Sequence, residues 1–93
     1  MRTIERSSTF KRDYKREAKG LHRNTLDGSL SAVLPALASD QQLELRYRDH
    51  DLSGDCAGYR ECHVKPDLLL IYRKSADDLL RLARLGSHSE LFG

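Results

Sequence analysis

Apolar residues in the first part of the chain recur at helical spacing. The short run 1–6 predicts a first strand, because it places β-branched residues ahead of a polar stretch. Phe10, Tyr14 and Ala18 then fall four residues apart, which puts them on one face of a helix whose other faces carry lysines and arginines. Gly20 is the expected end of this helix.

A second helical pattern follows Asn24 and Thr25, either of which can cap its start. Pro35 lies inside this pattern, so the sequence predicts either a kink or an end at the preceding residue. The two segments together predict a helical hairpin. The apolar positions of the second helix, repeating every three or four residues, are Leu26, Leu30, Val33, Leu34 and Leu37.

The pattern changes from helix to strand in the second half. Residues 39–58 are irregular and predict a loop with one short strand at 45–47. The unbroken apolar run that begins at Leu68 is typical of a central strand buried on both faces. The predicted strands, turns and tail are strands at 59–64, 68–73 and 79–85, turns at 66–67 and 75–78, and a tail at 87–93.

This order of elements predicts an α+β fold, in which two N-terminal helices pack on one face of a small twisted antiparallel sheet. A chain of 93 residues provides for a single domain, taken as 1–93. The longest apolar run is too short to cross a bilayer, and no apolar segment follows the first basic residue as in a signal peptide. We therefore expect the protein to stay in the cytoplasm.

The distribution of charge along the chain is more informative about a binding partner than the net charge. The formal net charge is +2, but basic residues crowd the first helical segment. Such a segment is either an anion-binding patch or simply a solvated helix face, and charge alone does not decide between them. The basic positions are Lys11, Arg12, Lys15, Arg16 and Lys19.

The usual motifs of metal and nucleotide chemistry are absent from the sequence. It contains no HExxH, GxSxG, GxGxxG or phosphate-binding GxxxxGK element. Cys56 and Cys62 are six residues apart, and a set made with His50 and His63 matches no common zinc module. We expect two free thiols in a reducing compartment, and neither metal nor cofactor.

Histidines near strand ends are the remaining candidates for chemistry. His63 ends a predicted strand, Asp67 follows the next turn, and His88 follows the last strand, while His50 lies in the irregular loop. In a meander these positions can converge at one edge, where histidines would donate and accept protons near neutral pH. The alternative is that each of these histidines is an ordinary surface or packing residue. For His22, which lies beside the basic segment, we expect a plain surface residue.

Three stretches of the sequence resemble the YafQ branch of the RelE/ParE toxin superfamily. YRDHDLSG at 47–54 resembles its Y-(K/R)-D-H-x-L-x-G element, and GYRECHVKPDLLLIY at 58–72 is similar to G-x-R-x-x-H-V-x-P-D-x-(L/I)-L-I-Y. RLGSHSELFG at 84–93 resembles the closing R-x-G-(S/T)-H-x-x-L-F. Together they cover the C-terminal half at matching spacing.

The resemblance implies a fold similar to microbial ribonucleases and a toxin that cuts messenger RNA in the ribosomal A site without metal. It implies that a cognate antitoxin, of a DNA-binding ribbon-helix-helix type, holds the toxin in check. The basic helical segment would face 16S ribosomal RNA of the 70S ribosome. Carried over by position, the implied catalytic residues are His50, His63, Asp67 and His88, and the implied substrate-binding residues are Arg60, Arg84 and Phe92.

Two other functions remain open at this stage. A ParE-like toxin has the same fold and poisons DNA gyrase, but that branch generally lacks this set of histidines. A non-catalytic module would use the basic helix to bind RNA or protein, and would be indifferent to substitution of His63 or His88.

Overall fold

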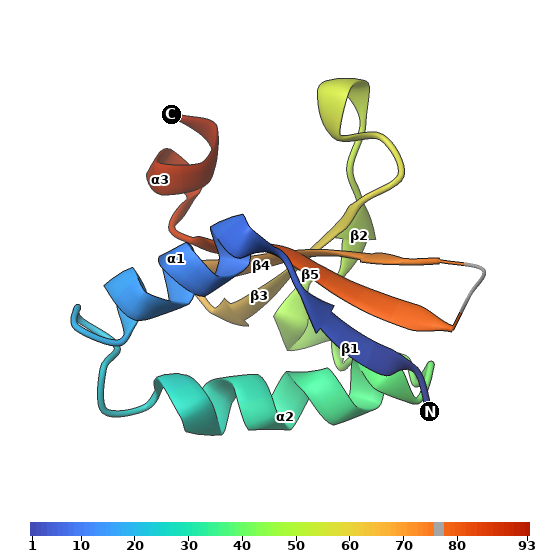
Figure 1. The fold of residues 1–93 in the computed structure, drawn as a ribbon, viewed down its shortest axis with the longest axis horizontal. Coiled ribbons are helices and arrows are strands. Elements are labelled where there is room, and N and C mark those ends of the chain that lie inside the picture. Colours follow the sequence, from blue (N-terminus) through green and yellow to red (C-terminus); the bar gives the residue numbers. More distant parts are fainter. Residues whose placement is uncertain (76–77) are drawn as a thin grey trace.

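The computed structural model describes residues 1–75 and 78–93, which form a five-stranded sheet with helices around it (Figure 1). The strand order is β1-β5-β4-β3-β2, with β1 parallel to β5 and every other neighbouring pair antiparallel. The elements are β1 (Thr3–Arg6), α1 (Ser8–Glu17), α2 (Leu26–Ala38), the 3₁₀ turn η1 (Leu45–Tyr47), β2 (His50–Asp51), the 3₁₀ turn η2 (Gly54–Cys56), β3 (Arg60–Lys65), β4 (Leu68–Lys74), β5 (Leu79–Gly86) and α3 (His88–Phe92).

The hydrophobic core lies between α2 and one face of the sheet. The apolar stripe of α2 is buried as its spacing predicts, and Phe10 of α1 joins it. The sheet contributes alternate residues of β4, namely Leu68, Leu70 and Tyr72, each at most 1% exposed. Each such large side chain stabilises the fold by about 1.5–3 kcal/mol relative to exposure. The predicted α+β class, with helices against a sheet, is confirmed.

Both predicted helices form, with different ends from those expected. The side chain of Ser7 caps α1 by accepting a 2.9 Å hydrogen bond from the Phe10 N–H. This helix ends at Glu17, three residues before Gly20. Of the two alternatives for Pro35, an end of α2 at Leu34 is wrong, because the helix continues to Ala38. Pro35 falls in the last turn, where only a few hydrogen bonds remain to be lost.

The sheet is more elaborate than the predicted meander. The N-terminal strand pairs in parallel with β5, which makes the sheet mixed, and the short strand β2 adds to its other edge. The strand predicted at 45–47 is wrong, because these residues form the turn η1. The tail beyond Gly86 contains a short helix, α3. The predicted turn at 75–78 includes residues 76 and 77, which lie outside the described part of the chain.

A bulge in β5 decides which residues reach the core. Tyr72 pairs with Leu82 but Ile71 pairs with Arg84, so Ala83 is the extra residue. Simple alternation would place Leu85 on the face of Leu79, whereas the bulge turns Leu85 into the core at 0% exposure. Arg84 is thereby left on the opposite face.

Two further predictions concern the chain as a whole. Both cysteines are free, as expected. No helix of the described residues combines the length and apolar character that a bilayer span requires.

Candidate functional site

The candidate site lies on the face of the sheet opposite the core. Alternation along β3 sends Cys62 and Val64 into the core, and Glu61 and His63 to this other face. The neighbouring positions on β4 are Ile71, which pairs with Glu61, and Leu69, which pairs with His63. The helix α3 and the segment around β2 both rise above this face, away from α2 (Figure 1).

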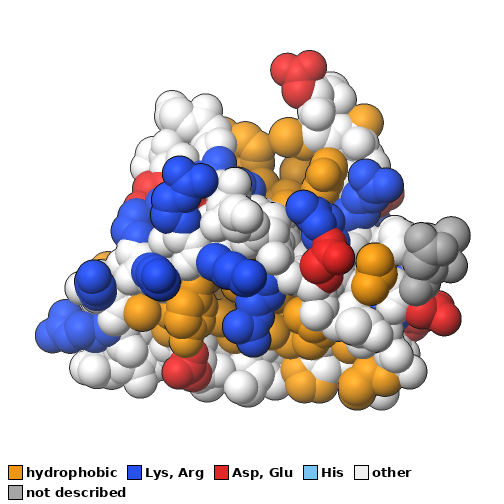
Figure 2. All heavy atoms as spheres, viewed as in Figure 1, with side chains coloured by type: hydrophobic (Ala, Val, Ile, Leu, Met, Phe, Trp, Pro, Cys, Tyr) orange, Lys and Arg blue, Asp and Glu red, His pale blue; other side chains and the backbone are white. Residues whose placement is uncertain are grey.

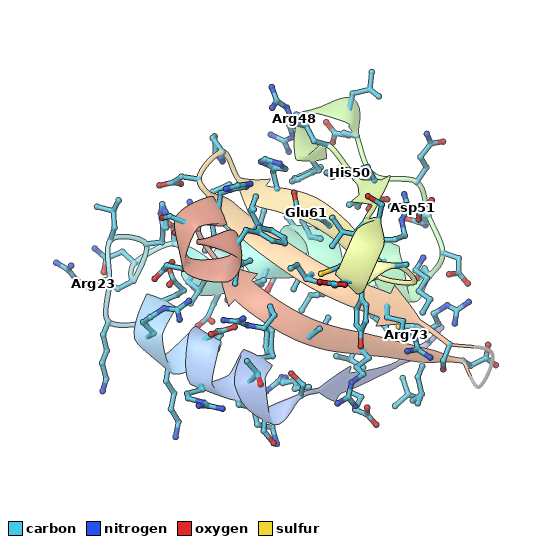
Figure 3. All side chains as sticks on the ribbon, turned by 90° about the horizontal axis from the view of Figure 1, so that it is seen from above. Arg23, Arg48, His50, Asp51, Glu61 and Arg73 are labelled. Atoms are coloured by element: carbon cyan, nitrogen blue, oxygen red, sulfur yellow. The ribbon has the colours of Figure 1, made fainter. Side chains whose placement is uncertain are left out.

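His50 and His63 lie on either side of one carboxylate. The Nε2 atoms of both rings are 3.7 Å from Oε1 of Glu61, whose side chain is only 8% exposed. Figure 3 shows His50 and Glu61 side by side. The pairing of His50 with Glu61 across β2 and β3 brings them together, and the i, i+2 spacing on β3 adds His63.

Backbone carbonyls select which ring nitrogen is free for proton transfer. Nδ1 of His50 is 2.7 Å from the carbonyl of Arg48, and Nδ1 of His63 is 3.4 Å from the carbonyl of Pro66. A carbonyl can only accept, so each Nδ1 carries a proton and donates it. The Nε2 atoms, which face Glu61, are therefore the ones that exchange protons. Both Nε2 atoms lie within ion-pair distance of Glu61, although 3.7 Å is too long for a hydrogen bond.

Asp67 has a partner that the sequence analysis did not foresee. Its Oδ1 is 3.0 Å from Nε2 of His22, in the connection between α1 and α2. The His22 side chain is 17% exposed, so it is not the plain surface histidine expected from its position. This contact fastens the β3–β4 turn to the helical layer. Asp67 and His63 form no hydrogen bond or ion pair with each other in the described part of the chain.

His88 belongs to the short helix α3. Ser87 caps this helix, and Glu90 completes a capping box by accepting the Ser87 backbone N–H. The rings of His88 and Phe92 lie 5.2 Å apart, so this catalytic candidate and this substrate-binding candidate lie side by side. Within the described residues, His88 makes no contact with His50 or His63, although it lies above the same face of the sheet.

The tight seating of α3 depends on Gly86. A Cβ added there would lie 2.7 Å from Nη2 of Arg16 and 3.2 Å from Leu91. Arg16 in turn pairs with Glu90 at 2.9 Å and donates to the carbonyl of Leu85 at 2.8 Å. Arg16, expected as a ribosome contact, thus also ties α1 to α3.

Arg60 is held by three groups of the protein. Its guanidinium contacts Asp49 at 3.1 Å and Asp51 at 2.5 Å, and Nε donates to the Tyr72 hydroxyl at 3.3 Å. Tyr72 in turn donates to Asp49 at 2.5 Å. The hydrogen bond to Asp49 raises the pKa of Arg60 above its ordinary value. A phosphate would have to compete with these partners, so the network primarily anchors the segment that carries His50.

Arg84 is similarly paired, with Asp13 of α1. Nε of Arg84 donates to Asp13 at 2.9 Å, and the backbone N–H of Leu85 adds a 3.0 Å bond. Burial raises the pKa of the Asp13 carboxyl, but the bonds from Arg84 and Leu85 outweigh it, so the pKa lies below its usual value. The Arg84 side chain remains 35% exposed.

The basic helical segment has an exposed cationic surface. Figure 2 shows Lys and Arg side chains gathered over α1. All five predicted members are exposed: Lys11, Arg12, Lys15, Arg16 and Lys19. No group of three or more His, Cys, Asp or Glu side chains in residues 1–75 and 78–93 is placed to hold a metal ion.

Glu61 is the functional candidate that sequence reasoning missed. Its signal was its position two residues before His63 on a strand, where a charged side chain shares the face of the histidine. His22 was missed for a different reason, since only the tertiary fold brings it to Asp67.

Comparison with known proteins places this geometry in a family. Residues 2–93 match the family described as "Bacterial toxin of type II toxin-antitoxin system, YafQ". The mRNA interferase toxin YafQ of Escherichia coli K12 is 38% identical over 92 residues, covering 97% of this chain and 99% of the relative. The putative toxin YafQ of Haemophilus influenzae is 32% identical over 90 residues, with 94% and 88% covered.

Solved structures agree with the sequence comparison. A copper-bound mutant toxin from Helicobacter pylori superposes with a TM-score of 0.86 at 39% identity, covering 99% of this chain and 100% of that one. The toxin in the E. coli DinJ-YafQ complex gives a TM-score of 0.84 at 38% identity, with both chains fully covered. A metal-bound H. pylori toxin gives 0.81 at 43% identity, with 99% and 100% covered. The chain belongs to the YafQ family of bacterial toxins of type II toxin–antitoxin systems.

Proposed function

We propose that this chain is an mRNA interferase, an endoribonuclease that cuts messenger RNA in the ribosomal A site and is neutralised by a cognate antitoxin. The observation that carries the proposal is the pair His50 and His63 on either side of buried Glu61. Two imidazoles whose Nε2 atoms flank one carboxylate can supply the proton transfers that RNA cleavage needs. The relatives named mRNA interferase toxin YafQ support the same activity.

The proposed reaction is attack by a ribose 2′-oxygen on the adjacent phosphorus. The bond from phosphorus to the 5′-oxygen breaks, which leaves a 2′,3′-cyclic phosphate and a 5′-hydroxyl. His50 and His63, with Asp67, act on the nucleophile side, where one Nε2 accepts the 2′-hydroxyl proton. His88 donates a proton to the departing 5′-oxygen, and Phe92 positions the substrate.

Glu61 is a positioning residue in this scheme. It faces both Nε2 atoms and can keep the two rings oriented while a proton moves between them. Arg84, partly exposed on the same face, is the arginine better placed to steady phosphate charge, although it shares its guanidinium with Asp13. Arg60 contributes indirectly, by fixing Asp49 next to His50.

The proposed chemistry uses no metal, since acid–base groups suffice for both proton transfers. The metal-bound and copper-bound H. pylori toxins make metal a variable to be tested directly. The exposed lysines of α1 would contact 16S ribosomal RNA, in a phosphate-driven interaction that weakens with salt. The E. coli DinJ-YafQ complexes support an antitoxin as the protein partner.

The decisive experiment is cleavage of a defined messenger RNA with and without programmed 70S ribosomes. Wild type, His63→Ala and His88→Ala are compared, each with EDTA and with added copper. Arg81→Gln, which changes a residue paired with Glu5 at the opposite edge of the sheet, serves as control.

We expect ribosome-dependent, EDTA-resistant cuts that both histidine variants lose by about 100-fold or more. Absence of cutting by folded wild-type protein would refute the nuclease. Loss of cutting in EDTA, restored by metal, would refute the metal-free mechanism alone.

A further inference from the structure

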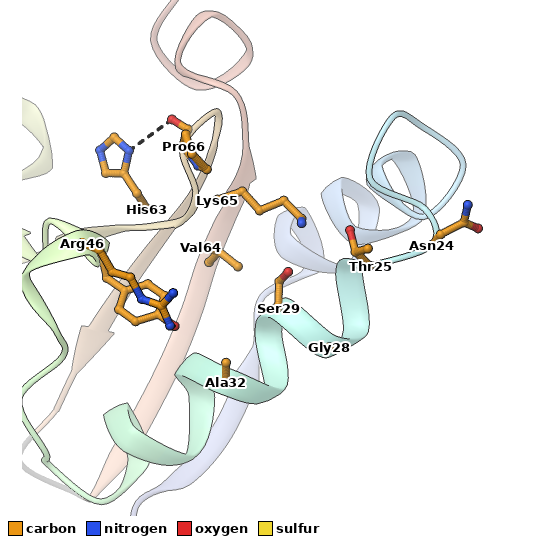
Figure 4. A pocket seen from close by; sticks show the side chains of 11 residues that line it. Asn24, Thr25, Gly28, Ser29, Ala32, Arg46, His63, Val64, Lys65 and Pro66 are labelled. Carbon is orange, nitrogen blue, oxygen red and sulfur yellow. Dashed lines mark hydrogen bonds between the residues drawn. The ribbon is translucent and has the colours of Figure 1, made fainter.

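A second feature lies on the other side of the β3–β4 turn from the acid–base residues. It is a cavity of about 720 Å³ between the start of α2, the turn η1 and the end of β3. Figure 4 shows Thr25, the N-cap of α2, and Ser29 on one side of it and Arg46 on the other, with Val64 between them. His63 lines this cavity as well as facing Glu61, so the cavity adjoins the proposed reaction centre.

The charge of the cavity favours an anionic ligand. Its lining includes Arg46 and Lys65 but neither aspartate nor glutamate among the described residues. Lys65 is half-buried, and within the described chain it forms no ion pair. In Figure 4 its side chain extends toward Thr25 and Ser29, whose hydroxyls can donate further hydrogen bonds. A phosphate between them would gain a cation and two donors.

The opposite wall is a flat stacking surface. The guanidinium of Arg46 lies over the Tyr47 ring, 4.7 Å from its centroid, and donates to the Tyr47 hydroxyl at 2.8 Å. Arg46 pairs otherwise only with Glu44 in the described residues, at 3.4 Å and in solvent. Planes of this kind are used to stack unpaired RNA bases, because both guanidinium and aromatic faces attract the π-face of a base.

We infer that this cavity is an RNA subsite, which holds one nucleotide of the message next to the bond that is cut. The nucleotide's base stacks on Arg46 and Tyr47, and its phosphate binds Lys65. The volume falls within the usual range of small-ligand pockets, about 300–1,000 Å³, which accommodates a nucleotide. The inference rests on the proposed function, because an RNA must already lie across His63 for its neighbour to enter the cavity.

The test is binding of a 2′-O-methyl tetranucleotide, which cannot be cut because its 2′-oxygen is blocked. Fluorescence anisotropy gives the affinity, and ¹⁵N spectra of the full chain report which backbone amides shift. Lys65→Gln removes the charge and Lys65→Arg keeps it. Tyr47→Leu removes the ring and Tyr47→Phe keeps it. Arg81→Gln is the matched loss of one charge far from the cavity.

We expect Lys65→Gln and Tyr47→Leu each to weaken binding about tenfold. The Arg and Phe variants should restore most of the affinity, and the control should stay within about twofold of wild type. Tyr47 packs against the core, so the Lys65 pair decides the result if Tyr47→Leu unfolds. Equal affinities for Lys65→Gln and wild type would overturn the inference.

Two further arms separate the outcomes. If both variants lose affinity for the cognate antitoxin but not for the tetranucleotide, the cavity is a protein-binding site and the inference fails. Cleavage on ribosomes is measured in parallel. Cutting by wild type that is unaffected in Lys65→Gln leaves the proposed function intact and refutes the subsite. Lys65-dependent binding without any cutting supports the subsite and refutes the nuclease.

Discussion

Adjacent residues of β3 carry two polar networks that differ in kind. Arg60 points to one face and is held by Asp49, Asp51 and Tyr72 at 2.5–3.3 Å. Glu61 points to the other face and lies 3.7 Å from His50 and His63. The first network consists of hydrogen bonds from Arg60 to three partners, whereas the second is held only at ion-pair distance. A closed network fixes structure, whereas an open one leaves groups available for chemistry.

The largest expected effect is in thiol reactivity, which tests how completely the core face of β3 is buried. Cys62 shares the core face with Arg60, and burial raises the pKa of its thiol to about 12, with help from Asp49 and Glu61. At pH 8 only about one such thiol in ten thousand is ionised. Iodoacetamide should therefore modify the partly exposed Cys56 about a thousandfold faster, as followed by mass spectrometry. Comparable rates in folded protein would show that the core face admits solvent.

Glu61→Gln tests whether the network of Glu61, His50 and His63 contributes more to cleavage than to the stability of the fold. The amide keeps the shape but cannot share a proton with the two imidazoles, so cleavage should fall about 10- to 100-fold. Stability should change by less than about 1 kcal/mol, because a buried carboxylate costs desolvation that the amide avoids. Ribosomal cleavage and urea unfolding measure the two effects, with Glu5→Gln as control. Unfolding of the variant with normal activity in the folded fraction would reverse the assignment.

Arg60→Ala tests the closed network. It leaves Asp49 and the buried Tyr72 hydroxyl without their cation, and should lower the free energy of unfolding by about 1–3 kcal/mol. Urea denaturation gives the value. Arg73 is an exposed arginine on the next strand, β4, and it lies over the ring of Tyr59. Arg73→Ala should change the free energy of unfolding by no more than about 0.5 kcal/mol. Equal effects of the two substitutions would mean that the Arg60 network is not structural.

Acid should have the smallest effect, acting on the ion pairs that brace α1 and α3. The pKa of Asp13 is lowered in the folded protein, so its stabilisation is complete above the ordinary carboxyl pKa and is lost as pH falls through the folded value. Thermal stability should therefore fall as the pH drops below the ordinary carboxyl pKa of about 4. Asp13→Asn should show a shallower decline, and an unchanged slope would assign the acid effect to other carboxylates such as Asp40, whose pKa is about 2.

Much of the fold followed from local patterns. The apolar stripe of α2 and the apolar run of β4 predict buried surfaces from the sequence, because the spacing of their apolar residues matches the geometry of a helix and of a strand. The local pattern left the effect of Pro35 on α2 open and mispredicted the turn η1, since a proline in a last turn and a short loop are decided by their neighbours. The register of β5 was missed for a related reason, because a bulge at Ala83 leaves no mark in the sequence.

The sequence by itself determined the α+β class and, through motif resemblance, supplied the candidate site residues. The tertiary structure alone decided which partners those residues have. Glu61 lies between His50 and His63. Asp67 pairs with His22, and Arg84 pairs with Asp13. The physical reason is the distance along the chain over which each interaction acts. Periodicity is set by the dihedral geometry of neighbouring residues, whereas a hydrogen-bond partner is set by strand register and packing between segments distant along the chain.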